Sequence, residues 1–449
     1  MMIDEKLIKN LIAENHSFSL DQVLSKAEKK HGLSLEESAF LLNLEDKGSL
    51  DLIFKSANKV KSEIYGNRLV LFAPLYISDY CINDCEYCAF HCRNRSLVRN
   101  KLDKDAIRTQ TELIIKMGHK RILLEAGEHP EISIDYVCDA IRTIYDTKVN
   151  NGEIRRVNVN IAATSVSDYK KLKEIGIGTY QLFQETYHRK TYEKLHKGPK
   201  ADYDRQINAH SRAFEAGIDD YGIGVLFGLY DYKFEVLSLL CHARYMEEKF
   251  GVGPHTISVP RFQRASTVDY APEYPVSDSE FLKLIAVLRL SVPYVGMIIS
   301  TRESPKIRQK AFEIGISQTS AASKTSPGGY STCQDSQFEL SDHRSVDEVV
   351  KSMCAQGKLP SFCTACYRSQ RTGEAFMKLA KTGNIHFLCH PNAILTFKEF
   401  LADYASPELK KIGEDVISRE LEKIPDNERK EETKNRLKRI ENGERDLFF

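Results

Sequence analysis

The sequence predicts an α/β fold, a (β/α)8 TIM-type barrel with an N-terminal helical extension and a mainly helical C-terminal domain. Three observations support this fold class. Eight strand-like runs alternate with helix-like runs between residues 68 and 323, the first 66 residues lack that alternation, and it stops again after Gly329. Eight strands separated by helices are typical of parallel βαβ units, and the count favours a closed barrel over a partial barrel or an open doubly wound sheet.

The N-terminal segment is polar and has a helical pattern. Leu7 and Leu11, and further along Leu35 and Ala39, stand four residues apart, which places each apolar pair on one helix face. We therefore expect residues 1–66 to form a helical extension that precedes the barrel.

The barrel itself is predicted to occupy residues 67–335. Its strand-like runs are 68–78, 121–127, 155–163, 179–186, 221–229, 255–260, 296–300 and 316–323. Helix-like runs separate them, for example 104–118, 133–145, 204–217 and 279–290. Barrel enzymes keep their chemistry in the loops at the carboxyl ends of such strands, so candidate residues in those loops carry the most weight.

The C-terminal domain is predicted to cover residues 336–449. It contains two cysteine-bearing segments, at 361–377 and 386–393, and becomes strongly charged from Pro407 onward. Because proline cannot continue a helix interior, Pro425 should separate two solvated helices in this tail.

Composition limits the possible functions. The 449 residues are 42% hydrophobic and 28% charged, and 64 Lys plus Arg against 63 Asp plus Glu leave a formal charge of +1. This balance gives no basic stripe for nucleic acid or for an anionic membrane surface, and no apolar run has transmembrane length. The opening residues lack signal or transit character, so we expect a cytoplasmic protein. In a reducing compartment, clustered cysteines indicate metal or redox work rather than disulfides.

Three cysteines lie immediately after the first predicted strand. Cys81, Cys85 and Cys88 have x3 and x2 spacing, in a loop that Asn83 and Asp84 make polar. Three thiolates on one loop can hold a four-iron cluster and leave one iron open for another ligand. The alternative is zinc, which usually takes four ligands from two CxxC pairs and has no partner pair on this loop.

This CxxxCxxC loop resembles that of the radical S-adenosylmethionine (SAM) superfamily, with Tyr87 at the aromatic position before the last cysteine. The resemblance implies a [4Fe-4S] cluster whose open iron is chelated by the amino and carboxylate groups of SAM. Reductive cleavage of SAM then gives a 5′-deoxyadenosyl radical that abstracts hydrogen. The protein's part is to orient the cofactor and to exclude water and oxygen.

Further residues match SAM-binding elements of that superfamily. Gly127 and Glu128 match the Gly-Gly-Glu element for the SAM amino group, with alanine in place of the first glycine. Glu185 closes the fourth strand and can accept ribose or amino hydrogen bonds, and Arg205 can bind the SAM carboxylate. The segment that ends at Gly228 resembles the adenine-side element. Each residue alone is equally compatible with a surface charge or a tight turn.

A second cysteine set lies far along the chain. Cys363, Cys366 and Cys389 form a CxxC pair plus a distant cysteine, with His386 and His390 close by in sequence. Spacing alone leaves zinc and an iron–sulfur cluster both open.

Much of the chain, from about residue 70 to about residue 405, resembles the HydG family of [FeFe]-hydrogenase maturases, which are tyrosine lyases. The matching stretches are 155–163, 178–188, 222–231, 251–261, 299–303, 316–323, 327–330, 361–368, 371–377 and 389–393. The related tyrosine lyase of thiamine synthesis, ThiH, resembles the barrel part alone and lacks the C-terminal cysteines.

The HydG resemblance implies two reactions. The radical activates tyrosine, whose Cα–Cβ bond breaks to give p-cresol and dehydroglycine, and dehydroglycine becomes CO and cyanide. It further implies a second [4Fe-4S] cluster joined through a free cysteine to an extra "dangler" iron, which collects the diatomics as an Fe(CO)2(CN) unit. A transient partner is then a hydrogenase-maturation scaffold protein, and we expect a monomer or weak dimer that binds neither nucleic acid nor membrane.

His255 stands at the amino end of the sixth predicted strand, so it faces the opposite end of the barrel from Cys81. Imidazole is a normal iron ligand, and the resemblance assigns this histidine to the dangler iron. The C-terminal domain would then close the far end of the barrel, with an internal passage between the two sites. The alternative is a histidine that caps a strand by binding a backbone carbonyl.

Arg302 follows the seventh strand, on the expected SAM side. Its planar guanidinium can bind the tyrosine carboxylate with two hydrogen bonds, assisted by Ser317 or Ser320 of the eighth strand. The alternative is an ordinary salt bridge with Glu303 or Glu185.

The remaining cysteines have no metal spacing and are interpreted as ordinary residues, although Cys92 lies close to the first cluster; they are Cys92, Cys138, Cys241, Cys333 and Cys354. Two other functions remain open: dehydroglycine (2-iminoacetate) synthesis for thiamine, and a non-catalytic iron–sulfur carrier.

Overall fold

The structure is a computed structural model that describes residues 2–332 and 336–449. Cys333 and the last residue of the predicted barrel domain lie outside the described residues.

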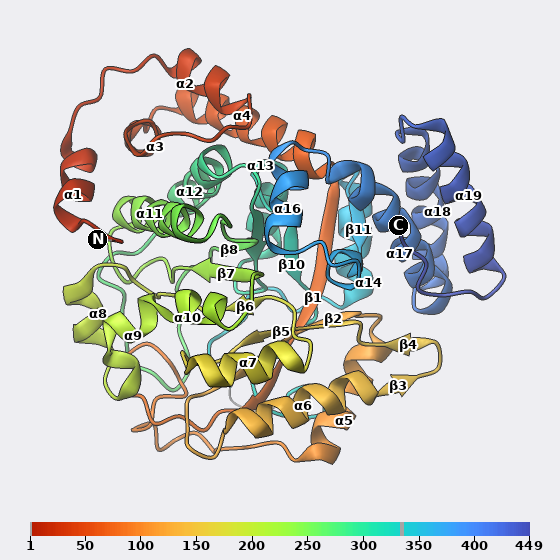
Figure 1. The fold of residues 1–449 in the computed structure, drawn as a ribbon, viewed down its shortest axis with the longest axis horizontal. Helices are drawn as coiled ribbons and strands as arrows, with labels where there is room; N and C mark the ends of the chain where they lie inside the picture. The colour runs from red at the N-terminus through yellow and green to blue at the C-terminus, as the bar shows by residue number, and fades with distance from the viewer. Residues whose placement is uncertain (1, 333–335) are drawn as a thin grey trace.

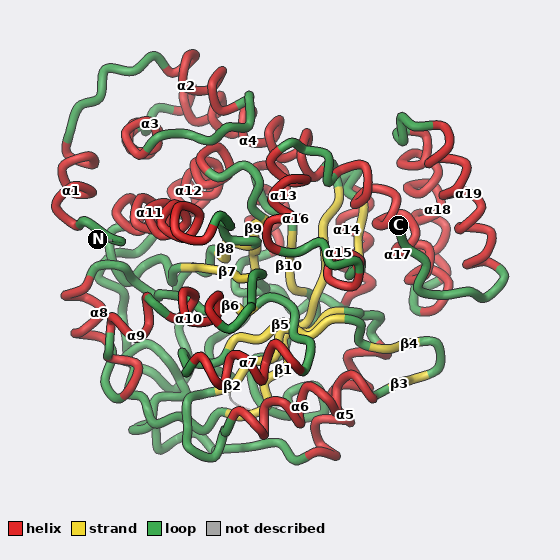
Figure 2. Tube along the Cα trace, viewed as in Figure 1, coloured by secondary structure: helices red, strands yellow, loops and turns green. Residues whose placement is uncertain are grey.

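Eight parallel strands form a closed barrel at the centre of the molecule (Figure 2). They are β1 (Arg68–Ser78), β2 (Arg121–Ala126), β5 (Arg156–Asn160), β6 (Tyr180–Gln181), β7 (Tyr221–Gly224), β8 (Thr256–Ser258), β9 (Gly296–Ile299) and β10 (Gln318–Ser320). Each strand pairs with the next, and β10 returns to β1 with Thr319 opposite Leu71. The predicted (β/α)8 barrel is confirmed.

Helices surround the strands (Figure 1). They are α5 (Lys104–Lys116), α6 (Ile134–Asp146), α7 (Val166–Glu174), α8 (Arg189–Leu195), α9 (Tyr203–Ile207), α10 (Ala209–Glu215), α11 (Tyr232–Phe250), α12 (Asp278–Ser291) and α13 (Pro305–Ile314). A 3-10 turn spans Pro199–Ala201, and a small hairpin joins β3 (Lys148–Val149) to β4 (Gly152–Glu153). The helical run expected at 204–217 is divided between α9 and α10.

Most of these helices begin at a side chain that accepts a hydrogen bond from the first turn. Asp103, Ser133, Asp231, Ser277 and Ser304 cap α5, α6, α11, α12 and α13 in this way. Such caps contribute about 1 kcal/mol each, because the first backbone N–H groups of a helix have no partner within it. The βα junctions are therefore fixed locally by the sequence.

Every barrel strand after β1 is shorter than the sequence predicts, and β6 and β7 show the effect clearly. The run expected at 179–186 keeps only two residues in β6, and the run at 221–229 ends at Gly224. Glu185 has a left-handed backbone with φ of +66°, which ends the extended conformation. The chain bends away at this end of the barrel and opens space inside it.

Flanking segments pack on the outside and at one end of the barrel. The N-terminal helices are α1 (Glu5–Ala13), α2 (Leu20–Ala27), α3 (Leu35–Asn43) and α4 (Lys47–Tyr65), and α4 packs against α12 and α13. After the barrel come α14 (Val346–Ala355), β11 (Leu359–Ser361), α15 (Ala365–Arg368), α16 (Gly373–Lys381), α17 (His386–Asp403), α18 (Pro407–Glu422) and α19 (Asn427–Glu441). Helices α18 and α19 lie at the right edge of Figure 1, against α17.

Strand β11 joins the C-terminal segment to the barrel sheet. The first residues of β1, Arg68 to Val70, pair in parallel with Leu359 to Ser361, whereas Val70 to Phe72 pair with β10. Strand β1 therefore extends beyond the barrel at its amino end and carries an extra neighbour there. This pairing brings Cys363, two residues past β11, to that end of the barrel.

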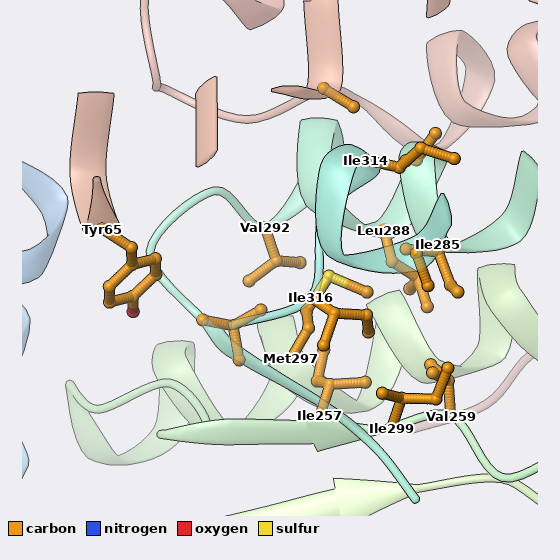
Figure 3. Close-up of a cluster of buried hydrophobic side chains, with 14 of the residues drawn as sticks. Tyr65, Ile257, Val259, Ile285, Leu288, Val292, Met297, Ile299, Ile314 and Ile316 are labelled. Atoms are coloured by element: carbon orange, nitrogen blue, oxygen red, sulfur yellow. The ribbon is translucent and has the colours of Figure 1, made fainter. Parts of the chain in front are cut away.

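The core between strands and helices follows the alternation of each strand (Figure 3). Ile257 of β8 and Ile299 of β9 point outward and pack with Ile285 and Leu288 of α12, all at most 1% exposed. Ser258 points the other way and lines the inside of the barrel. Burying each aliphatic side chain stabilises the fold by about 1.5–3 kcal/mol. Because these outward-facing residues stabilise the barrel, polar residues that face its inside can serve a site.

Within the described residues, no helix is both long and apolar enough to cross a membrane.

Candidate active site and second cysteine cavity

A large cavity opens at the carboxyl ends of the barrel strands, and we call it the carboxyl-end cavity. It encloses about 1550 Å³, including its open mouth. The predicted site residues that line it are Cys81, Cys85, Cys88, Tyr87, Gly127, Glu128, Glu185, Arg302 and Ser320. The structure thus brings together side chains from the loops after β1, β2, β6, β9 and from β10.

The three early thiols share this cavity. Burial raises the pKa of Cys85 well above its usual value and that of Cys88 to about 11. Such thiols stay protonated until a metal displaces the proton. Among the described residues, no three His, Cys, Asp or Glu side chains converge on one single-ion position. Three thiols that line one cavity can hold a four-iron cluster, as their spacing on the loop predicts.

Backbone contacts fix the cysteine loop. A Cβ on Gly127 would lie 2.3 Å from the Tyr80 carbonyl oxygen, so only glycine allows the end of β2 to approach the loop this closely. The Cys92 N–H donates to the Asn83 carbonyl at 2.8 Å, and the Cys92 side chain is exposed.

Four of the residues predicted to bind SAM belong to three ion-paired or hydrogen-bonded groups beside the thiols. Arg205 Nη2 donates to Glu128 Oε1 at 2.6 Å, and Asn83 Nδ2 donates to the other oxygen of that carboxylate at 2.7 Å. The Tyr87 hydroxyl lies 2.8 Å from His196 Nε2. Lys200, which the sequence did not single out, donates to Glu185 Oε1 at 2.7 Å.

Gly228, like Arg205, does not line the carboxyl-end cavity. Its φ of +120° requires glycine, and a Cβ there would lie 3.1 Å from Phe262 Cβ. The cavity wall is formed by Leu226 and Phe262 at this point, and Gly228 lies behind them. Its observed role is to shape the turn after β7.

Arg302 reaches the carboxyl-end cavity without an ion-pair partner among the described residues. Both alternatives predicted for it are occupied, since Glu303 pairs with Arg261 and Glu185 pairs with Lys200. The guanidinium lies 3.1 Å from the centre of the Phe338 ring. Burial lowers the pKa of Arg302, although Tyr76 and Glu125 act in the opposite direction.

The two serines offered as helpers of Arg302 lie at different ends of the barrel. Ser320 lines the carboxyl-end cavity, and its Oγ accepts from the Thr301 N–H at 3.2 Å. Ser317 lies at the opposite end, where its Oγ accepts from the Met297 N–H at 3.1 Å. Ser317 is therefore not a candidate tyrosine ligand.

Glu125 is a cavity residue that the sequence reasoning missed. It is the fifth residue of β2 and points into the carboxyl-end cavity. Burial raises its pKa to about 7, although Tyr76 and Arg302 act in the opposite direction. The one available signal was a charged residue inside an otherwise apolar strand.

A second cavity of about 520 Å³ lies at the amino ends of the strands, and we call it the amino-end cavity. Cys363, Cys366, Cys389 and His255 all line it. A hydrogen bond from the Cys366 thiol lowers the pKa of Cys389 to about 6 and raises that of Cys366. His386 and His390 do not line this cavity; His390 Nε2 instead lies 2.9 Å from the Glu420 carbonyl oxygen.

His255 is held on three sides. Its Nδ1 lies 2.9 Å from Asp220 Oδ2, and its ring stacks on Phe376 with centroids 3.9 Å apart and on Tyr367 at 5.8 Å. Burial opposes ionisation of Asp220, but the imidazole holds the pKa of that carboxyl below its usual value. The predicted alternative, a ring on a backbone carbonyl, is not the observed contact.

Three arginines from the amino ends of β1, β2 and β5 surround the amino-end cavity. Arg68 and Arg121 line it, and Arg121 Nη2 donates to the Cys363 carbonyl at 2.9 Å. Arg156 stacks on Tyr367, 3.3 Å from the ring centre. Their positive charge suits a site that collects thiolates.

An apolar layer lies between the two cavities. Phe72, Leu123 and Ile298 cluster inside the barrel and form part of the carboxyl-end cavity wall. Val70, two residues before Phe72 on the same strand, lines the amino-end cavity. The two cavities therefore lie at opposite ends of one barrel, one layer of side chains apart.

Comparison with known proteins agrees with this arrangement. The Radical SAM superfamily model matches residues 75–238, and the Biotin and Thiamin Synthesis associated domain matches residues 258–358. The chain is 30% identical to the 2-iminoacetate synthase of Escherichia coli (strain K12) over 333 residues, which span 73% of this chain and 86% of that protein.

Solved structures extend the similarity to the whole chain. A crystal structure of HydG, a maturase of the [FeFe]-hydrogenase, superposes with a TM-score of 0.97 at 55% identity and covers 100% of both chains. The FeFe-hydrogenase maturase HydG from Carboxydothermus hydrogenoformans superposes with a TM-score of 0.83 at 42% identity, covering 93% of each chain.

The barrel, the cysteine loop at its carboxyl end and the superfamily match define a radical SAM enzyme, a carbon–carbon lyase. Within that superfamily the chain belongs to the HydG family of [FeFe]-hydrogenase maturases.

Proposed function

We propose that this enzyme cleaves the Cα–Cβ bond of tyrosine to p-cresol and dehydroglycine. Dehydroglycine is then converted to CO and cyanide at a second iron site, for the Fe(CO)2(CN) precursor of the hydrogenase H-cluster. One observation carries the proposal: a barrel with a three-cysteine cavity at each end, the second of which also contains His255.

The carboxyl-end cavity fits a [4Fe-4S] cluster with SAM. Cys81, Cys85 and Cys88 would hold the cluster, and Glu128 with Arg205 would meet the amino and carboxylate groups of SAM. When both are bound, the cluster and SAM together supply the 5′-deoxyadenosyl radical. The protein's own contribution is a cavity that orients the cofactor. It also supplies the guanidinium of Arg302, which is free to bind the substrate carboxylate.

The amino-end cavity fits the auxiliary site. Cys363, Cys366 and Cys389 would hold a second [4Fe-4S] cluster, and His255 would bind the dangler iron joined to it through a free cysteine. The donor set is soft thiolate plus imidazole, which suits iron, and the adjacent arginines offset the negative charge. Only the side-chain layer of Phe72, Leu123 and Ile298 separates the two cavities, so dehydroglycine that crosses this layer need not enter solvent.

A second candidate function is 2-iminoacetate synthesis without further conversion, favoured by the 30% identity to the Escherichia coli enzyme. It gives no role to a second three-cysteine cavity. The two functions differ in whether Cys363 and Cys366 are needed for any product.

The deciding experiment is anaerobic reconstitution with iron and sulfide, followed by incubation with SAM, tyrosine and dithionite. We expect p-cresol, CO and cyanide together. Cys85→Ala should abolish all three products, whereas Cys363→Ala with Cys366→Ala should keep p-cresol and abolish CO. Cys354→Ala, a buried cysteine outside both cavities, is the matched control and should retain every product.

Two outcomes would reject parts of this proposal. Intact SAM after incubation would remove the lyase assignment. p-Cresol without CO or cyanide from the unsubstituted protein would leave 2-iminoacetate synthesis. We further propose that the product passes in the cytoplasm to a hydrogenase-maturation scaffold protein, as the family membership suggests.

A further inference from the structure

Two side chains of opposite charge line the carboxyl-end cavity without an ion-pair partner among the described residues. Glu125 comes from β2 and Arg302 from the loop after β9, with β10 and β1 between them around the barrel. Both are half-buried and line the same cavity. A ligand in this cavity can therefore contact both side chains.

The other charges that line this cavity are already paired. Glu128 binds Arg205 at 2.6 Å, and Glu185 binds Lys200 at 2.7 Å. Within residues 2–332 and 336–449, neither Glu125 nor Arg302 takes part in an ion pair. With Glu128 and Arg205 assigned to SAM and Glu185 paired with Lys200, the carboxyl of Glu125 and the guanidinium of Arg302 are left for the substrate.

The two groups nevertheless influence each other. Arg302 acts to lower the pKa of Glu125, and Glu125 acts to raise that of Arg302, although no atoms of the pair lie in ion-pair contact. Burying an unpaired charge is costly, and a ligand that carries both opposite charges removes that cost on each side. A zwitterion is the simplest such ligand.

We propose that Glu125 binds the α-ammonium group of the substrate while Arg302 binds its carboxylate, so that this cavity selects a zwitterionic α-amino acid. The inference rests on the proposed function and adds the residue that holds the nitrogen. The Tyr76 hydroxyl, which donates to Gln337 Oε1 at 2.8 Å, lines the same cavity and also contacts Glu125, whose pKa it lowers.

The position of this carboxylate matters for the reaction. p-Cresol and dehydroglycine together contain all the atoms of tyrosine, and dehydroglycine is an imine. The nitrogen must therefore lose a hydrogen as the Cα–Cβ bond breaks. A side chain that fixes the nitrogen fixes a reacting atom, which makes Glu125 a catalytic residue.

A binding matrix tests the proposal without turnover. The reconstituted protein with SAM, unreduced, is titrated by equilibrium dialysis with L-tyrosine, tyramine, which lacks the carboxylate, and 3-(4-hydroxyphenyl)propanoate, which lacks the ammonium. Glu125→Gln should lower the affinity for tyrosine and for tyramine by about tenfold or more. The affinity for the propanoate should stay nearly unchanged. Arg302→Gln should lower the affinity for tyrosine and for the propanoate and leave the affinity for tyramine nearly unchanged.

The control is Glu131→Gln, an exposed carboxylate in the loop after β2. It should change none of the three affinities. Equal weakening of all three ligands by Glu125→Gln, or no weakening, overturns the inference. If that variant fails to fold, the unsubstituted protein still decides, because a propanoate that binds as tightly as tyrosine leaves no ammonium site.

The failures of the two proposals are distinguishable. Tyrosine that binds with the predicted charge preference but yields no p-cresol rejects the proposed function and supports the site. p-Cresol formation with an unchanged ligand preference in Glu125→Gln rejects the site and supports the function.

Discussion

At the scale of single residues, the two cavities differ in how their reactive groups are held. The early thiols rely on a tight backbone approach at Gly127, whereas His255 relies on side chains, being fixed between Asp220, Phe376 and Tyr367. A carboxylate on Nδ1 leaves Nε2 free, which is the arrangement that orients metal-binding histidines.

Asp220→Asn should therefore loosen the imidazole without removing it. We expect the affinity of the amino-end cavity for the extra iron to fall about 10- to 100-fold, while p-cresol is still formed. Iron counted after a chelator wash, together with the electron paramagnetic resonance signal of the second cluster, measures this directly. The neighbouring Asp219→Asn is the control, and equal iron loss from both variants would contradict the role given to Asp220.

Residue identity was predictable where spacing carries chemistry. The two cysteine triplets and His255 could be singled out from the sequence because short spacing and strand position are local properties. Glu125 and Asp220 could not, since their significance comes from neighbours far away in sequence: Arg302 across the barrel and His255 on the adjacent strand.

At the scale of secondary-structure elements, α11 secures the loop that follows β6. Glu235 on this helix accepts from the Tyr187 N–H at 2.8 Å and from the Thr186 hydroxyl, and it is completely buried. Burial raises its pKa to about 8, so at neutral pH the folded protein holds a proton there that the unfolded chain has lost.

This carboxyl makes stability depend on pH. Its stabilising contribution is full below the unfolded pKa near 4.5 and is lost as pH rises toward 8, because only the unfolded state ionises freely in that window. Glu235→Gln should flatten this slope, which is at most about 1.4 kcal/mol per pH unit. Urea unfolding of both proteins from pH 5 to 8 tests it, and parallel curves would show that Glu235 does not titrate there.

Element positions followed from alternation, and the misses have physical reasons. The run 68–78 is almost continuously apolar and matches β1, but β6 was overestimated because its second half turns at Glu185. Strand β11 was not expected at all: three residues that include Pro360 have no periodicity, and proline is tolerated there only because the strand lies at an edge.

At the scale of the whole molecule, a buried charge network joins the C-terminal helices to the barrel. Glu399 of α17 binds Arg155 at 2.6 Å and Lys120 at 3.4 Å, and all three side chains are at most 4% exposed. Removing one partner of such a group leaves the others charged and without solvent, which typically costs about 3–5 kcal/mol.

Glu399→Gln should accordingly destabilise the protein by roughly that amount and loosen the amino-end cavity, seen as a lower thermal midpoint and as faster loss of the second cluster than of the first. Glu408→Gln, which breaks an exposed pair with Lys351, should cost less than about 1 kcal/mol. Similar losses from the two variants would mean that the network does not hold α17 in place.

Barrel closure was predictable from the number of strands, since each βα unit adds one parallel neighbour until the first and last meet. The docking of the C-terminal helices was not, because it depends on long-range pairs such as Arg155 with Glu399 that leave no periodic signal.

The extra length of β1 makes solubility depend on the presence of β11. Its first three residues present backbone donors and acceptors that Leu359 to Ser361 cover. A chain that ends before Leu359 would expose an unpaired strand edge. Such edges pair with other chains and lead to strand swapping and aggregation. We therefore expect a chain truncated before Leu359, which also lacks the late thiols, to aggregate rather than stay in solution as a partly active enzyme.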